Sequence, residues 1–79
     1  MIPPYYIGKH YGYEASKVVE DFQGDNYNIG TAITYLLRAG KKAYVNNDAF
    51  DSKLEDLRKA KAHIEFEILA MENELKHKS

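Results

Sequence analysis

The sequence predicts an all-α fold in which an N-terminal extended arm, two short helices and one long C-terminal helix form a helical homo-oligomer. Two observations carry this prediction. Apolar residues recur at spacings of three and four in three separate segments, which is the period of an amphipathic helix. The chain has only 79 residues and no cysteine, and chains of this size usually gain stability from a partner or a covalent link. We expect a single domain, residues 1–79.

The N-terminal arm comprises residues 1–9. It contains both prolines of the chain and shows no apolar periodicity, so we expect an extended, polyproline-like segment. The first helix is expected over roughly residues 13–23, and Gly24 follows it as a stop signal. Its apolar residues share one helical face: Ala15, Val18, Val19 and Phe22.

The second helix is expected to begin after an N-cap at Asn28 and to continue to Ala39. Gly40 suits the position just beyond a helix end. Gly30 lowers helix stability, so it indicates the close approach of another backbone or of a ligand. The apolar residues of this helix form a wide stripe that we expect to be buried: Ile29, Ala32, Ile33, Leu36 and Leu37.

The longest helix is expected from a capping box at Ser52 and Glu55 to about Lys76, a segment without glycine or proline. Alternating steps of three and four define a coiled-coil seam with one lysine interruption: Leu54, Leu57, Lys61, Ile64, Ile68, Met71 and Leu75. This helix would be roughly 37 Å long, about twice the length of either preceding helix. Its distal half would be exposed in a monomer, so we infer that residues 66–79 supply the seam of a homo-oligomer.

Composition argues against several classes of function. A formal net charge of −1 creates no global attraction to nucleic acid, so we expect no nucleic-acid partner. No apolar run is long enough to span a bilayer, so we expect no membrane partner and a cytoplasmic location. The three histidines, His10, His63 and His77, share no ligand spacing, and acids two residues apart, such as Glu65 and Glu67, point in different directions on a helix. Neither a metal centre nor a metal-dependent hydrolase is favoured.

A basic notch is the best local indication of a ligand. The cations around the end of the second helix and on the next helix are Arg38, Lys41, Lys42, Arg58, Lys59 and Lys61. If the two helices fold back as a hairpin, these cations meet beside Tyr35 and Tyr44, which suits a phosphate and a stacked base. Two structural interpretations stay open. Cations at a helix end complement its dipole without a ligand, and an ion pair between Arg38 and Asp56 would fix the helices and leave no pocket.

Three motifs, found in order, carry a resemblance to a known family. They are His10-Tyr11, the segment Tyr-Asn-Ile-Gly-Thr-Ala-Ile-Thr-Tyr-Leu-Leu-Arg-Ala-Gly-Lys-Lys at 27–42, and Glu-Asp-Leu-Arg-Lys-Ala at 55–60. The region they define, residues 10–65, resembles the SaV-like family of small phage proteins, which includes a podovirus nucleotide kinase that lacks a phosphate loop. Two positions depart from the family pattern: Thr31 replaces an asparagine and Thr34 replaces a lysine.

The resemblance implies a nucleotide ligand bound at a helical oligomer, with Mg²⁺ as a cofactor only if the chain is a kinase. The predicted nucleotide-binding residues are His10, Tyr11, Gly30, Thr31, Thr34, Tyr35, Arg38, Lys41 and Lys59, and no residue is predicted to be catalytic. The predicted function is a small phage-type nucleotide-binding protein of the host-cell cytoplasm. The alternative is a non-catalytic helical interaction or sequestering protein that inhibits a host factor or a nucleotide signal.

Overall fold

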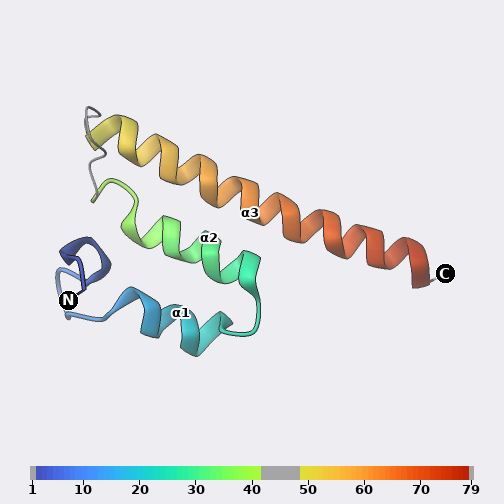
Figure 1. The fold of residues 1–79 in the computed structure, drawn as a ribbon, viewed down its shortest axis with the longest axis horizontal. Coiled ribbons are helices and arrows are strands. Elements are labelled where there is room, and N and C mark those ends of the chain that lie inside the picture. The colour runs from blue at the N-terminus through green and yellow to red at the C-terminus, as the bar shows by residue number, and fades with distance from the viewer. Residues whose placement is uncertain (1, 42–48, 79) are drawn as a thin grey trace.

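The computed structural model describes residues 2–41 and 49–78 and contains three α-helices in this part of the chain (Figure 1). They are α1 (Ala15–Gln23), α2 (Tyr27–Arg38) and α3 (Ala49–Lys78). α2 lies between the other two, and α3 continues well past both of them toward the C-terminus (Figure 1). The predicted all-α fold with a long last helix is confirmed. Within the described ranges, no helix has both the length and the apolarity needed to cross a membrane.

The beginning of the chain is more compact than an extended arm. Pro4–Tyr6 form one turn of 3-10 helix, with proline at its first position. The prediction of an extended arm over residues 1–9 is therefore wrong for residues 4–6. The fixed φ of proline suits a polyproline segment and the first position of a helical turn equally well, so the two prolines did not distinguish them.

A short loop joins this turn to α1 and holds the N-terminal segment against the helices. Ile7 and Glu14 form an isolated antiparallel bridge, and the Gly8 amide donates a hydrogen bond to the Tyr13 carbonyl at 2.8 Å. Gly12 has a φ of 72°, a conformation that favours glycine because it has no Cβ. The loop therefore places the tyrosines of the N-terminal segment beside the start of α1.

The N-cap of α2 is Asn26, whose side chain accepts a hydrogen bond from the Ile29 amide at 2.8 Å. The predicted cap, Asn28, lies inside the first turn, where its Oδ1 is 3.0 Å from Nδ1 of His63. Both asparagines have suitable capping chemistry, and the tertiary contact to α3 uses the second one. The end of α2 follows the prediction, since Gly40 adopts a φ of 81° just beyond it.

Gly30 lies at a close contact between α1 and α2. A methyl group at this buried position would lie 3.1 Å from Cγ1 of Val19 and 3.2 Å from the carbonyl oxygen of Gln23. The close approach predicted from the sequence is therefore an approach by α1. The glycine lowers helix propensity but lets the two helices pack closely.

Replacing Gly30 with leucine is expected to destabilise the fold by about 1–3 kcal/mol, because the side chain would push α1 away from α2. Thermal and urea unfolding followed by circular dichroism measures this change. Gly30→Ala serves as the control, since its gain of about 1 kcal/mol in helix propensity opposes a much smaller steric conflict. Equal stability of the leucine and alanine variants would show that the contact with α1 is not tight.

α2 packs antiparallel to the N-terminal half of α3 through small and polar residues. At one end Nδ2 of Asn26 donates to Oε2 of Glu67 at 3.2 Å, and at the other Arg38 pairs with Asp56. In the described part of the chain, the buried apolar side chains all belong to alanines: Ala15, Ala32 and Ala60. A single chain therefore has a thin core in which helix backbones approach each other closely.

α3 begins at Ala49, three residues before Ser52, so the capping box predicted at Ser52 and Glu55 is wrong. Ser52 lies inside the helix and is fully buried, as is Asp56 one turn later. No described residue provides a hydrogen-bond partner for the Ser52 hydroxyl. Ser52 shares a helix face with Asp56, which pairs with Arg38 of α2, and its burial accounts for a small residue here better than capping does.

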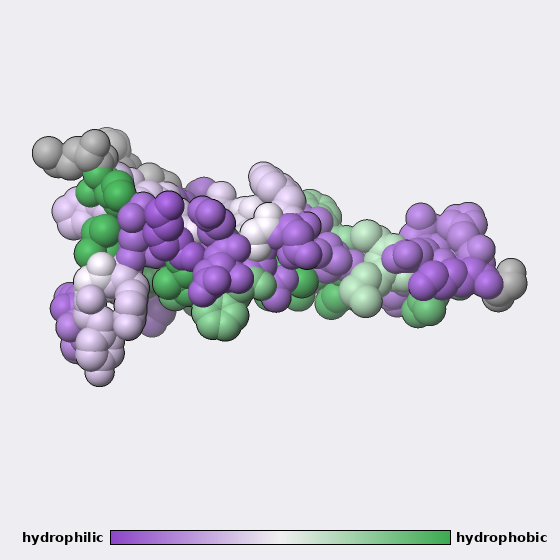
Figure 2. Space-filling model, turned by 90° about the horizontal axis from the view of Figure 1, so that it is seen from below, coloured by the Kyte–Doolittle hydropathy of each residue, from purple (hydrophilic) through white to green (hydrophobic). Residues whose placement is uncertain are grey.

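The coiled-coil seam predicted from the sequence, hereafter the α3 stripe, lies beside the α3 face that α2 covers and borders α2 only at Ile64 and Ile68. Its apolar members are Leu54, Leu57, Ile64, Ile68, Met71 and Leu75, and their exposed fractions rise from 37% at Leu54 to 66% at Leu75. The residues that α2 covers, such as Asp56 and Ala60, lie roughly a quarter-turn away around the helix. Hydrophobic residues accordingly reach the surface along the molecule, including the part of α3 beyond the other helices (Figure 2).

Two residues of α2 that we expected to be buried are exposed as well. Leu36 is 49% exposed and Leu37 is 40% exposed, so the predicted burial of the whole α2 stripe is wrong for its C-terminal end. α1 covers one face of α2 and α3 covers another. The apolar stripe of α2 extends around more of the helix than these two contacts cover. The single chain thus exposes apolar surface on two neighbouring helices.

Candidate functional site

An Arg38-centred network joins the N-terminal turn, α2 and α3. Nη2 of Arg38 donates to Oδ1 of Asp56 at 3.1 Å, and Nη1 donates to the Tyr6 hydroxyl at 2.9 Å. The guanidinium also lies 4.7 Å from the ring centroid of Tyr35. Arg38 is only 8% exposed and Asp56 is not exposed at all. The ion pair considered as a structural alternative is therefore present, and it is buried.

Burial disfavours the charged form of Arg38, but hydrogen bonds to Tyr6 and Asp56, together with attraction to the Asp56 carboxylate, outweigh it. The net effect raises the pKa of Arg38 above its ordinary value. Arg38 is therefore cationic over the whole physiological range. Its charged group binds Tyr6 and Asp56 of the same chain. Arg38 therefore links the N-terminal turn, α2 and α3.

The Tyr35 ring has two cations, Arg38 and Lys59, and the imidazole of His63 as close neighbours. Nζ of Lys59 is 5.5 Å from the ring centroid of Tyr35, and Lys59 also pairs with Glu55 at 3.2 Å. The His63 ring stacks on Tyr35 with centroids 6.0 Å apart and 22° between planes. Cation–π and stacking contacts of this kind fix the tyrosine between α2 and α3.

Three other predicted residues lie on the part of α2 that faces α1. Gly30, Thr31 and Thr34 line an open hollow of about 310 Å³ together with residues of α1. The Thr34 hydroxyl donates to the Gly30 carbonyl at 2.9 Å, one helical turn earlier. These threonines are therefore separated from Lys59, which lies on the opposite side of α2 on α3.

Lys41 belongs to a third location, a pocket between the N-terminal segment, the start of α1 and the end of α2. The cavity has a volume of about 230 Å³ and is lined mainly by apolar surface. Its aromatic walls are Tyr5, Tyr6 and Tyr13, with Leu37 contributed by α2. The rings of Tyr5 and Tyr6 are 4.6 Å apart at their centroids. We refer to this cavity as the tyrosine pocket.

His10 and Tyr11 lie in the exposed loop before α1. Tyr11 is 83% exposed, and its ring centroid lies 6.1 Å from that of Tyr13, which lines the tyrosine pocket. Lys42 and Tyr44, which the predicted notch included, fall outside the described residues. The structure thus brings Tyr35, Arg38 and Lys59 together, and it divides the remaining predicted residues between the α1-facing hollow, the tyrosine pocket and the exposed loop.

Sequence reasoning missed the tyrosines of this pocket. An excess of tyrosine is visible in the composition, with seven among 79 residues, and it suggests rings at a site or interface. The 3-10 turn and the bridge that bring Tyr5, Tyr6 and Tyr13 together have no clear pattern in the sequence. Within the described ranges, no three histidine or acidic side chains gather closely enough to hold a metal ion.

No protein-family model, curated protein or solved structure matches the chain. The resemblance to the SaV-like family rests on the three sequence motifs and stays a prediction.

Proposed function

We propose that the protein binds a nucleotide, with its base in the tyrosine pocket and its phosphate near Lys41. The observation that carries this proposal is a cavity with three tyrosine walls and one lysine. Aromatic rings stack on any nucleobase, and a lysine attracts phosphate. The resemblance to the SaV-like family supports the same class of ligand independently.

The size of the pocket favours partial enclosure of the ligand. A volume of about 230 Å³ lies below the range of about 300–1,000 Å³ common for small-molecule sites. The pocket suits one planar ring system, and the ribose and phosphates would remain outside it. Lys41 is exposed and would contact those phosphates without the loss of solvation that a buried charge requires.

Arg38 has a positioning role in this proposal. Its hydrogen bond to the Tyr6 hydroxyl, at 2.9 Å, fixes one aromatic wall of the pocket, while its ion pair with Asp56 fixes α2 against α3. Tyr11 is available beside Tyr13 at the exposed side of the loop. Binding would thus depend on Arg38 through the shape of the pocket.

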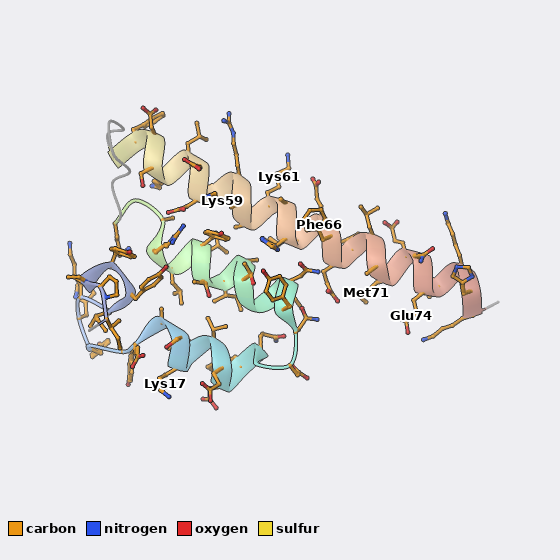
Figure 3. The ribbon with its side chains drawn as sticks, viewed as in Figure 1. Lys17, Lys59, Lys61, Phe66, Met71 and Glu74 are labelled. Carbon is orange, nitrogen blue, oxygen red and sulfur yellow. The ribbon has the colours of Figure 1, made fainter. Side chains whose placement is uncertain are left out.

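Lys41→Ala is expected to weaken nucleotide binding about 10- to 100-fold, the loss that follows when one charge-assisted contact to phosphate is removed. The measurement is the rise in melting temperature with added mono-, di-, tri- or cyclic nucleotides, since a ligand of the native state stabilises by mass action. Lys17→Ala is the matched control, because Lys17 lies on the side of α1 away from α2 (Figure 3). The proposal fails if no nucleotide raises the melting temperature of the unmodified protein, or if both variants weaken binding equally.

Nucleotide kinase activity with Mg²⁺ is a narrower form of the proposal, implied by the family resemblance. A coupled assay of phosphate transfer from ATP to nucleoside monophosphates, with and without Mg²⁺, distinguishes turnover from binding alone. Binding without turnover would make the protein a nucleotide-sequestering one.

The second candidate function is that of a non-catalytic interaction protein in the cytoplasm, which acts as a homo-oligomer or on a host protein. The observation that favours it is the exposure of the α3 stripe along the whole helix. Exposed apolar surface of this extent usually marks an interface. If the folded protein binds no nucleotide, the exposed α3 stripe would favour the second candidate over the first.

A further inference from the structure

The α3 stripe continues over nearly the whole of the longest helix. From Leu54 to Leu75 it covers about 32 Å at 1.5 Å per residue. Phe50, one step of the same spacing before Leu54, is also exposed. α2 packs mainly on a neighbouring face and borders the stripe only at Ile64 and Ile68, so most of the stripe is left open by the residues that the structure describes. An apolar groove of about 260 Å³ lies beside it, between Leu36 on α2 and Ile64 and Ile68 on α3.

We propose that the α3 stripe binds the α3 stripe of a second copy of this chain, with the two helices antiparallel and the two-fold axis near Ala62 and His63. This proposal goes beyond nucleotide binding and does not depend on it. The second copy is favoured over another partner because the apolar layers of the stripe, and the charged residues that flank it, complement themselves in this arrangement.

The apolar layers follow from the spacing of three and four. With the axis near residue 62, Leu57 lies opposite Ile68 of the second copy, and Leu54 lies opposite its Met71. Phe50 then lies opposite its Leu75. In each copy, the half of α3 that extends beyond α2 contains Met71 (Figure 3). This half would be covered by the N-terminal half of α3 from the other copy. Both helices overlap over almost their full length, which buries the most apolar area.

Lys61 is the one polar member of the stripe, and it would lie beside Ile64 of the second copy near the axis. It is exposed in the single chain. A lysine stem can cover apolar surface while its ammonium group reaches water.

The charges that flank the stripe favour the antiparallel orientation. In this register Arg58 lies beside Glu65 of the second copy, and Lys53 lies beside its Glu74. Asp51 beside Glu72 is an unfavourable pair, and the two copies of Lys61 lie only about 4.5 Å apart along the helix axis. Each half of the dimer therefore gains two attractive contacts for one repulsive contact, and the two halves share one further repulsive lysine pair at the axis. A parallel pair would instead place Lys53 beside Arg58 and Glu67 beside Glu72, both of which repel.

Disulfide trapping tests the orientation directly, since the chain contains no cysteine. In the antiparallel register, Leu57→Cys and Ile68→Cys should cross-link efficiently when the two variants are mixed and oxidised. Each variant alone should remain largely uncross-linked, because its two cysteines would be roughly 16 Å apart, too far for a disulfide. A parallel pair predicts the reverse, with each variant cross-linking to itself, and that result would overturn the proposal.

Charge exchange provides a second measurement on a protein that keeps its apolar stripe. Arg58→Glu and Glu65→Arg should each weaken self-association about tenfold in sedimentation equilibrium, and the double variant should recover most of the loss. Arg58 and Glu65 are exposed in the single chain, so folding should not change. The proposal is also overturned if the unmodified protein sediments as a monomer at about 100 μM.

Discussion

Arg38→Leu is expected to lower the free energy of unfolding by about 3–5 kcal/mol, the cost of leaving a buried charge without its partner. Asp56 has no exposed surface, and the guanidinium of Arg38 lies 3.1 Å from its Oδ1. The same substitution removes the hydrogen bond to Tyr6. Because single domains are stable by only about 5–15 kcal/mol, the variant should be partly unfolded at moderate temperature.

Urea unfolding followed by circular dichroism measures this loss, at one fixed chain concentration because self-association adds to apparent stability. Lys59→Ala is the control. Lys59→Ala removes a partly exposed ion pair with Glu55 and a cation–π contact with Tyr35, and each such contact contributes at most about 1 kcal/mol. Replacing Arg38 and Asp56 together with leucine should recover most of the stability, because no charge is then left buried. An Arg38→Leu variant as stable as the unmodified protein would rule out the structural role of the pair.

Arg38 therefore cannot be tested as a ligand contact by a single substitution that also destabilises the fold. A variant that unfolds loses nucleotide binding for a trivial reason. Lys41 is the better probe, since it is exposed and lies at the pocket without a buried ion pair. The two variants together separate the positioning role of Arg38 from direct contact with phosphate.

The helices could be predicted from the sequence because apolar periodicity determines them over many residues. The helix boundaries could be predicted less accurately, since a single residue decides where each helix begins or ends. Asn26 and Asn28 have the same capping chemistry, and only the contact between Asn28 and His63 shows why the second one is not the cap. Ser52 and Glu55 have the pattern of a capping box, but Ser52 lies inside α3 and is fully buried, and a small residue suits that position as well.

Helical spacing predicts some contacts of the candidate site and not others. Tyr35 and Arg38 are three residues apart on one helix, so their proximity follows from local geometry. Predicting the ion pair between Arg38 and Asp56 required an assumption about how α2 and α3 pack against each other. The tyrosine pocket depends on a 3-10 turn and an isolated bridge, which leave little trace in the sequence.

The second large effect is expected at the α3 stripe. Replacing Ile64, Ile68 and Met71 together with aspartate should raise the dissociation constant of the oligomer about a thousandfold or more. Each of these side chains contributes about 1.5–3 kcal/mol when buried, and three carboxylates in an apolar interface oppose association further. All three residues are exposed in the single chain, so the variant should remain helical and become monomeric. Analytical ultracentrifugation and circular dichroism measure the two properties separately.

Leu69→Asp is the matched control for this experiment. Leu69 is 61% exposed, similar to Met71 at 57%, but it lies on a different face of α3, well outside the stripe. Its substitution should leave the mass of the oligomer unchanged. If Leu69→Asp dissociates the protein as strongly as the triple variant, the interface is centred on another face of α3. A triple variant that keeps the full mass would exclude the α3 stripe from the interface, and the exposed Leu36 and Leu37 of α2 would then be the next surface to test.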